Sequence, residues 1–443
     1  MFLALNDDHH RSTGKFRKIT RDMTTQSTER KYKHMQGNNT KKGPVITIAL
    51  ITAISLLGNE MLFIVLPIYW KFFGLGSLWQ VGVLLSVNRF VRIPINSFVG
   101  WCYHKISKRT GVLIAVVLAA ISTYSYGMLK GFWLLLLMRI LWGVAWSFLR
   151  LGGYLTVISC SDGSSRGQLI GLYNGLWGLG SLFGMLIGGF LSDLIGITFI
   201  TSTFSLLAIL TIPLVIKYIP NFISGDSSEK GETESVLKNK DHQKVLLNGM
   251  LVAFVVYGIF FTTISKAVEH HLDGPLLLFG MSIGAAAIAG VVQSIKMSFD
   301  PFLAPAIGKW SDLKIGRLPF LTVALLAATI LFTILPFSNS SILFFSVIFA
   351  LQVTSTFLIT TSDSLAADLA KGPTSVKTMT YYTLFSDLGA ALGPLISFIV
   401  LDFIGLSWLY WITSLLLFIA FLYWIKEQRR LKVESRAAED LSF

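Results

Sequence analysis

The sequence predicts an all-α polytopic membrane protein with twelve transmembrane helices in two pseudo-symmetric six-helix bundles. Apolar residues make up 53% of the 443 residues and charged residues only 14%, whereas soluble domains carry about a quarter of charged residues. The apolar residues also form long runs, such as 45–69, 111–128 and 408–425. Each run is close to the ~20 residues that cross a bilayer as a helix. A glycine-rich motif that recurs in the second half indicates the duplication.

Twelve apolar segments predict the helices, because a backbone that crosses lipid must satisfy its own hydrogen bonds. The first six are expected at 45–70, 78–101, 111–130, 132–158, 167–193 and 197–218. The second six are expected at 245–267, 283–308, 317–337, 341–369, 377–402 and 405–425. The corresponding domains are a basic, disordered tail (1–44), an N-terminal bundle (45–218), a linker (219–244), a C-terminal bundle (245–425) and a tail (426–443).

The distribution of basic residues predicts the orientation. Most of the 37 Lys and Arg residues lie in the two tails and in the even-numbered connections, while the odd-numbered connections hold only Lys71, Lys130 and Lys266. The positive-inside rule therefore predicts a multi-pass protein of the cytoplasmic (plasma) membrane, with both termini in the cytoplasm. The net charge of +13 is spread over every inner loop. We therefore expect the lipid bilayer, and no nucleic acid, as its partner.

An internal repeat explains the organisation of the chain. The segment 180–188 and the segment 389–397 share glycines at an offset of 209, and Asp193 and Asp402 continue the match. An offset of 208 relates the loop after the second helix to its later copy, and it places Arg92 opposite Asp300. Transporters built from such repeats bind their substrates at the interface between the repeats.

A loop signature resembles that of the major facilitator superfamily. The segment 100–109 is similar to the family pattern Gly-x-x-x-Asp-Arg-x-Gly-Arg-Arg, with His104 in place of the acid and Ser107 in place of the second glycine. The second copy, 308–317, keeps the acid but has one extra residue. In the family this loop is a latch between conformations. The resemblance assigns that role to Gly100, His104, Lys105, Arg109, Gly308, Asp312 and Arg317.

Two further motifs resemble those of the twelve-helix, proton-coupled drug and metabolite antiporters of the same superfamily. Arg139 and Gly143 match an Arg-x-x-x-Gly pattern in the fourth helix, and the fifth helix is similar to the antiporter motif, with Met185 where proline is usual. The glycines are expected to pack helices closely, a role that generic packing in lipid would equally explain. They are Gly143, Gly171, Gly180, Gly184, Gly188, Gly189, Gly389 and Gly393.

Charged residues inside the expected helices indicate the site. Each costs roughly 2.5–3.5 kcal/mol at the centre of a membrane, so they must face a water-filled cavity or one another. Glu60 is the first candidate for a proton carrier, because a carboxyl group in a partly dry site binds a proton more readily than in water; Asp300 and Asp387 follow. The remaining polar members bind an anionic group or hold the acids ionised, or the whole set forms permanent ion pairs. They are Asn59, Arg89, Arg92, Arg139, Arg150 and Lys296.

These features predict a secondary active transporter that moves a small organic molecule by alternating access, with proton-coupled export as the leading hypothesis. Uptake of an anionic metabolite and flipping of a lipid or lipid precursor are the alternatives. No enzyme motif occurs in the helices, no cofactor beyond a proton gradient is expected, and the protein is expected to act as a monomer. A metal site is not expected at Glu269, His270 and His271, which lie either in a solvated outer loop or at the outer mouth of the seventh helix.

Overall fold

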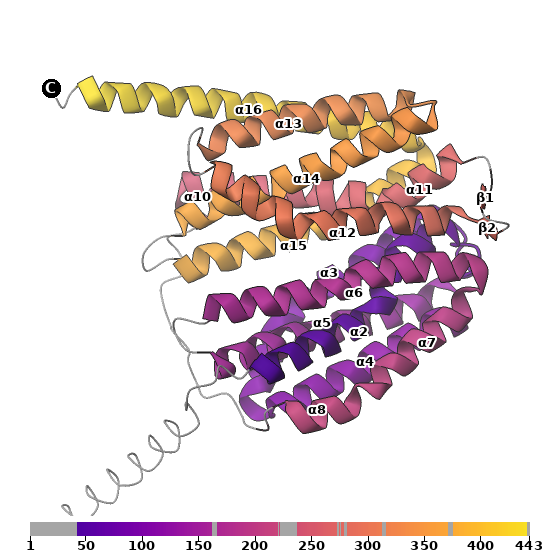
Figure 1. Cartoon of the computed structure of the whole chain (residues 1–443). Coiled ribbons are helices and arrows are strands. Elements are labelled where there is room, and N and C mark those ends of the chain that lie inside the picture. Colours follow the sequence, from indigo (N-terminus) through magenta and orange to yellow (C-terminus); the bar gives the residue numbers. More distant parts are fainter. Residues whose placement is uncertain are drawn as a thin grey trace, which may run out of the picture.

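The computed structural model describes residues 42–161, 166–219, 221, 237–272, 274, 276–278, 281–311, 316–370 and 375–440. The described part is a bundle of long helices with one short β-hairpin (Figure 1). The N-terminal half holds α2 (Lys42–Ile68), α3 (Leu78–Lys105), α4 (Lys108–Met128), α5 (Phe132–Cys160), α6 (Arg166–Leu194), α7 (Ile197–Leu210) and α8 (Ile212–Tyr218). Asp312 of the predicted loop motif and most of the predicted N-terminal tail and linker lie outside the described residues.

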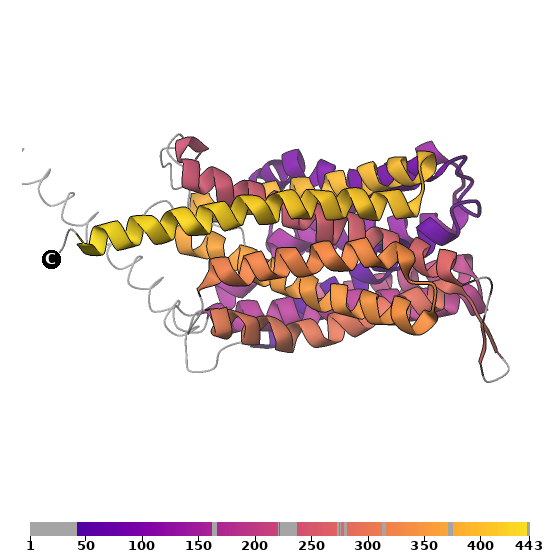
Figure 2. The ribbon, with the colours of Figure 1, turned by 90° about the horizontal axis from the view of Figure 1, so that it is seen from above.

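The C-terminal half repeats this series. Its helices are α10 (Lys240–Ala253), the π-helix η1 (Phe254–Phe260), α11 (Phe261–His271), α12 (Ala285–Trp310), α13 (Arg317–Ile334), the 3-10 turn η3 (Leu335–Phe337), α14 (Ser341–Leu369), α15 (Ser375–Phe403) and α16 (Leu406–Asp440). The strands β1 (Leu276–Leu278) and β2 (Met281–Ile283) pair antiparallel and precede α12. Seen from above, the hairpin projects from the end of the bundle opposite the C-terminus (Figure 2).

Ten helices of the described part are long and apolar enough to cross a membrane. The predicted number of twelve is not reached by this measure, because α3 and α12 fall outside the ten. Both have the length of a membrane span, with 28 and 26 residues. Both also carry charged residues, Arg89 and Arg92 on α3 and Lys296 and Asp300 on α12. The twelve-helix count therefore stays a prediction.

Three helices extend beyond the predicted bundle boundaries, and one of them is α2, which begins at Lys42 inside the predicted tail. Helix α10 begins at Lys240, inside the predicted linker, because Asn239 caps it by accepting hydrogen bonds from the backbone N–H groups of the first turn. Helix α16 continues to Asp440, past the predicted end at 425. Lys244 Nζ lies 2.7 Å from Glu427 Oε1, so the first turn of α10 is joined to the extension of α16.

The boundaries of the helices reproduce the repeat. Helix α6 spans 166–194 and α15 spans 375–403, so both ends differ by 209 residues. The same offset separates both ends of α5 (132–160) from those of α14 (341–369). Gly196 and Gly405, again 209 apart, both take a positive φ before α7 and α16, a conformation that glycine adopts without steric cost. The two halves are therefore duplicated in structure as well as in sequence.

The repeated glycines pack equivalent helices together. A Cβ on Gly180 would collide with the backbone of Ala53 in α2, and a Cβ on Gly389 would collide with the backbone of Met250 in α10. Gly184 and Gly188 continue the contact with α2, Gly393 contacts η1, and Gly143 packs α5 against α3. Gly189 instead contacts α12 of the other half.

Three of the glycines in the sequence motifs have no close neighbour. No heavy atom lies within 4 Å of the position that a Cβ would take on Gly171, Gly100 or Gly308. The expectation of tight packing is wrong for Gly171, although Leu169 and Tyr173 on the same turns of α6 are buried. For Gly100 and Gly308 the described neighbours likewise leave room for a side chain.

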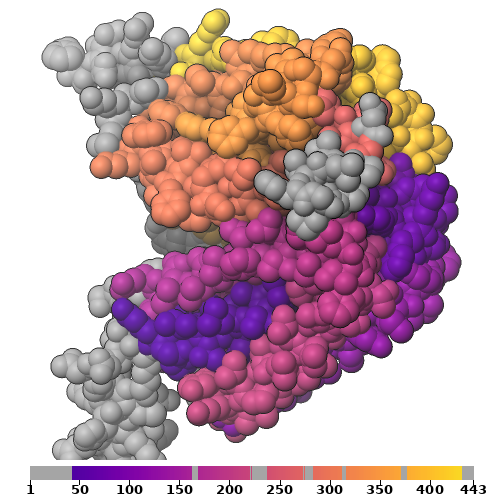
Figure 3. All heavy atoms as spheres, turned by 45° about the vertical axis from the view of Figure 1, so that its right-hand side comes forward, coloured from indigo at the N-terminus to yellow at the C-terminus, as the bar shows by residue number. Residues whose placement is uncertain are grey.

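The two halves meet mainly at the hairpin end of the molecule. Helix α3 packs on α15, and α6 packs on α12. A Cβ on Gly82 would lie 2.7 Å from Pro394 O, and one on Gly290 would lie 2.5 Å from Met185 O, so both contacts bring backbones together. At the opposite end a hollow separates the orange C-terminal half from the indigo and magenta N-terminal half (Figure 3).

Candidate functional site

A cavity of about 380 Å³ lies between the two halves. Side chains of α2, α3, α5 and α6 line it from one half, and side chains of η1, α11, α12 and α15 from the other. The predicted charged residues that line it are Glu60, Arg89, Arg92, Arg150, Lys296, Asp300 and Asp387, together with Asn59. The structure therefore brings together all but one of the intramembrane polar residues that the sequence analysis selected.

One ion pair joins the halves across this cavity. Arg92 Nη2 of α3 lies 3.6 Å from Asp387 Oδ1 of α15, and the two side chains are 12% and 21% exposed. Arg89 and Arg92 share a face of α3 because residues three apart are neighbours on a helix. The pair thus lies in the wall of the cavity, between two helices that pack against each other.

A second ion pair lies within one helix of the C-terminal half. Lys296 and Asp300 are four residues apart on α12 and pair with each other. Thr356 Oγ1 of α14 donates a hydrogen bond of 2.5 Å to Asp300 Oδ1. The Lys296 side chain is only 4% exposed, and a charge so buried requires such a partner.

Glu60 belongs to a hydrogen-bonded chain that runs from the cavity into the N-terminal half. Asn59 Nδ2 donates to Glu60 Oε1 at 2.9 Å, and Arg139 Nη1 donates to Asn59 Oδ1 at 2.6 Å. Arg139 also donates from Nε to the Leu84 carbonyl at 2.8 Å. Asn88 Nδ2 lies 3.4 Å from Asn59 Oδ1; this residue was not selected from the sequence.

The position of Arg139 bears on two predicted roles. The sequence predicts that it either binds an anionic group or holds the acids ionised, and since it is 1% exposed and does not line the central cavity, its position favours the second alternative. Leucine, phenylalanine and tyrosine side chains surround it behind the wall of the cavity. The described hydrogen bonds therefore connect Arg139 to Glu60 through Asn59.

Two cations of the cavity have no acidic partner among the described residues. Arg89 lies over the ring of Tyr257, 5.8 Å from its centre, and Arg150 forms no ion pair in the same part of the chain. The cavity lining contains four cations and three acids, and two of the acids are paired. Its surface thus carries an excess of positive charge on the side of Arg89 and Arg150.

Aromatic side chains complete the walls. Trp146 and Trp177 pack edge to face with ring centres 5.5 Å apart, and Phe63 of α2 meets Phe261 of α11 at 5.4 Å. Tyr257 was missed in the sequence analysis. The glycine contacts align Ala53 with Met250, 197 residues apart, and the same offset aligns Glu60 with Tyr257. That alignment needs the structure, because α2 and its copy share no motif.

Two duplicated acids connect the halves at the hairpin end. At the end of α6, the Asp193 carboxylate accepts a hydrogen bond of 2.9 Å from the backbone N–H of Ala287 in the first turn of α12. At the end of α15, Asp402 Oδ2 accepts from Ser77 Oγ, the N-cap of α3, at 2.5 Å. A carboxylate is favoured at a helix N-terminus because it meets unpaired N–H groups and the positive end of the dipole. We call these two contacts the paired acid clamp.

Tyr69 supports one side of the paired acid clamp, since its hydroxyl donates to Asp193 Oδ1. Burial, followed by the hydrogen bond to the Asp193 carboxylate, raises the pKa of Tyr69 above its usual value. The phenol therefore remains protonated and keeps its donor at physiological pH.

The predicted latch residues lie at the opposite end, and the contacts that the structure describes for Lys105, Arg109 and Arg317 are with their own halves. Arg109 Nε donates to the Ile219 carbonyl at 3.1 Å, and Lys105 lies over the Trp101 ring at 4.0 Å. Arg317 Nη1 lies 2.8 Å from Asp368 Oδ2. Gly100, His104 and Gly308 lie near the same ends of α3 and α12. In this conformation the contacts described for Arg109 and Arg317 join helices within a half.

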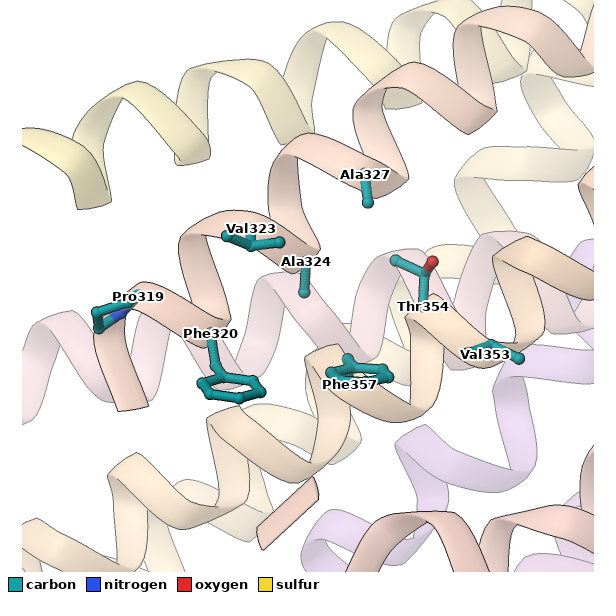
Figure 4. A pocket seen from close by; sticks show the side chains of 8 residues that line it. All are labelled: Pro319, Phe320, Val323, Ala324, Ala327, Val353, Thr354 and Phe357. Carbon is teal, nitrogen blue, oxygen red and sulfur yellow. The ribbon is translucent and has the colours of Figure 1, made fainter. Parts of the chain in front are cut away.

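A second cavity, of about 330 Å³, lies apart from the charged residues, between α13 and α14. Figure 4 shows that its wall consists of Pro319, Phe320, Val323, Ala324, Ala327, Val353, Thr354 and Phe357. The hydroxyl of Thr354 is the one polar side-chain group of this lining. Such a surface suits apolar chains and offers nothing to hold an ion. Among the described residues, no group of three His, Cys, Asp or Glu could hold a metal ion.

Comparison with known proteins relates the whole described bundle to one family. The family model described as "Major Facilitator Superfamily" matches residues 48–299 and 297–442. The chain is 25% identical over 364 residues to "Multidrug resistance protein MdtG" of Dickeya zeae (strain Ech586), covering 80% of this chain and 86% of that protein. It is 23% identical over 385 residues to the protein of the same name from Salmonella schwarzengrund (strain CVM19633), covering 83% and 92%.

Solved structures share the fold at low identity. A bacterial homologue of the human lysosomal transporter Spinster, in an inward-facing and occupied conformation, superposes with a TM-score of 0.71 at 17% identity, covering 87% of this chain and 96% of that one. The nucleoside transporter NupG gives a TM-score of 0.71 at 13% identity, covering 87% and 99%. Both likenesses concern the arrangement of helices.

Proposed function

Because the chain belongs to the major facilitator superfamily and is a multi-pass membrane transporter, not an enzyme, we propose that it exports a small organic molecule in exchange for protons. The observation that carries this proposal is the position of Glu60. Its carboxylate faces the cavity between the halves and bonds to Asn59, which Arg139 holds from behind. The multidrug resistance proteins among its relatives support export of organic compounds.

Glu60 couples proton movement to the movement of the organic molecule through its charge. As a carboxylate it presents a negative charge to the cavity, and a proton on it removes that charge. A neutral Glu60 lowers the cost of closing the cavity around it, since burial penalises the ionised form. A bound solute that pairs with the carboxylate lowers the same cost. Proton and solute therefore exchange at one position, and either allows the halves to rock.

The hollow and the paired acid clamp correspond to the two ends of the transport path. With both termini in the cytoplasm, as the distribution of basic residues predicts, the hollow faces the cytoplasm and the paired acid clamp closes the outer end. We propose this inward-open assignment for the conformation described here. We also propose the plasma membrane as its location and the monomer as the active form, since the cavity is formed by one chain.

Proteoliposomes test the coupling. The purified protein is reconstituted with a pH-sensitive dye inside, and a panel of organic cations and neutral drugs is added. Wild-type protein is expected to move protons out of acidic vesicles when a substrate is supplied, as it takes the substrate in. Glu60→Gln cannot change its charge, and we expect it to abolish proton movement while substrate binding persists. Glu269→Gln, which neutralises an acid that does not line the cavity and pairs with Lys266, is the matched variant that keeps coupling.

A second candidate function rests on a different observation. Arg89 and Arg150 line the cavity without an acidic partner in the described part of the chain, as a site for an organic anion would require. Uptake of an anionic metabolite then replaces drug export. The same vesicles separate the two: simple organic anions would accumulate in them and compete with one another, and Arg89→Gln would abolish that accumulation. Anion uptake would be excluded if organic cations drive proton movement in the wild-type protein and this movement is lost in Glu60→Gln.

A further inference from the structure

A smaller recess of about 180 Å³ opens within the C-terminal half, between α10, η1, α14 and α15. Its wall combines one acid, Asp363, with the phenols of Tyr257 and Tyr382, the hydroxyls of Thr383 and Ser386, and apolar side chains. Tyr257 also lines the central cavity, and Ser386 directly precedes Asp387 of that cavity. The recess is therefore a neighbour of the transport path and holds an acid that the coupling does not use.

Asp363 differs from the other acids inside the bundle. Asp387 and Asp300 each pair with a cation, and Glu60 accepts from Asn59. Asp363 is exposed to the recess and has no ion pair among the described residues. Ionisable residues within membrane spans face water-filled cavities and mark the paths of substrates and ions. A cation that enters the recess would supply a counter-ion for Asp363.

A chain of hydrogen bonds ends at the Asp363 carboxylate. Tyr382 donates its hydroxyl proton to Asp363 Oδ1 at 2.7 Å. Because a phenol has one proton to donate, Ser362, whose Oγ lies 2.9 Å from the Tyr382 oxygen, donates to Tyr382. Asn248 Nδ2 in turn donates to Ser362 Oγ at 2.9 Å. Donors aligned in this way stabilise the ionised acid, while Oδ2 accepts no described hydrogen bond.

We propose that this recess binds the ammonium group of an organic amine, with Asp363 as its counter-ion. The carboxylate takes the charge, the tyrosine rings attract a cation to their faces, and Val252, Ala253 and Ile359 accommodate its alkyl substituents. No described cation lines the recess, and Arg89 lies over the Tyr257 ring. A proton alone would need no such space and no apolar wall. The inference rests on the proposed function, of which it names the substrate class.

Binding of tetramethylammonium to the purified protein in detergent tests the proposal without any transport step. The wild-type protein is expected to gain thermal stability with increasing tetramethylammonium, since a ligand of the folded state stabilises it by mass action. Asp363→Asn keeps the shape of the side chain but not its charge, and should weaken binding at least tenfold. Asp368→Asn, an acid on the same helix outside the recess, is the matched control and should bind within about twofold of wild type, a small difference on the scale of about 1.4 kcal/mol per tenfold.

A second variant guards against a folding defect in Asp363→Asn. Ala253→Leu leaves every charge in place but fills the recess, so it too should lose tetramethylammonium binding. Unweakened binding in either variant would overturn the proposal, and so would an equal stabilisation of the wild type by sodium chloride or by neutral tert-butanol. If binding fails while Glu60-dependent proton movement persists, the recess assignment alone is wrong. If binding holds and proton movement is absent, the proposed coupling is wrong instead.

Discussion

At the scale of single residues, the position of Arg139 behind the wall of the cavity explains how a charge can be needed inside a membrane without touching the solute. Its guanidinium bonds to Asn59 and to the Leu84 carbonyl and so fixes the amide that holds Glu60. The motif in the sequence identified Arg139 as a candidate site residue. It did not show that Arg139 is buried behind the wall of the cavity. Depth depends on which side of α5 faces α3, and a single polar residue in an apolar helix does not reveal that.

Replacing Arg139 by lysine is expected to lower stability although the charge is kept. An ammonium group cannot reproduce the two directed bonds of the guanidinium, and a lost hydrogen bond to a charged group costs roughly 1.5–3 kcal/mol. Thermal unfolding in detergent should therefore show a lower midpoint for Arg139→Lys. Arg150→Lys, in an arginine of the cavity without an ion pair, should change the midpoint little. Equal stability of the two variants would contradict the structural role of Arg139.

At the scale of helices, the repeat read from the sequence accounts for most of the fold. The offset of 209 between the glycine motifs reappears in the ends of α5, α6, α14 and α15. It does so because glycines fix where two helices touch, and the contact fixes the register of each pair. The sequence could not predict the contact of Gly189 with α12, since that depends on how the halves dock. Gly171 shows the opposite error, a motif glycine without a close neighbour.

Substitution of these glycines tests the packing argument. Gly180→Ala should destabilise the protein by about 1–3 kcal/mol, because its methyl group would meet the backbone of Ala53 and force α6 away from α2. Gly171→Ala on the same helix should be neutral or stabilising by about 0.4–1 kcal/mol, because it restricts the unfolded chain and meets no neighbour. Thermal unfolding of both variants measures the difference. Equal losses would mean that close approach at Gly180 does not hold the helices together.

At the scale of the whole molecule, the paired acid clamp and the central cavity belong to one device. Asp193 and Asp402 are repeat partners, and each accepts a hydrogen bond at the N-terminal end of a helix in the opposite half. Opening the hairpin end must break both contacts.

Composition and periodicity predicted the bundles and most of the charged lining of the cavity. They could not predict the clamp, because both acids lie at helix ends, where solvated residues are common. Nor could they predict the recess at Asp363, whose walls come from α10, η1, α14 and α15.

Distance measurement between spin labels at the hairpin end is the most direct test of the central claim that protonation of Glu60 permits the halves to rock. Trp133 and Ile342, exposed residues 209 apart that begin α5 and α14, would be labelled as cysteines after Cys102 and Cys160 are replaced by serine. The account predicts distance distributions that differ between pH 5 and pH 8 in the otherwise wild-type protein. In Glu60→Gln the distribution should match that of the protonated protein at both values. A distribution that ignores pH, or that responds to pH equally in Glu60→Gln, would contradict it.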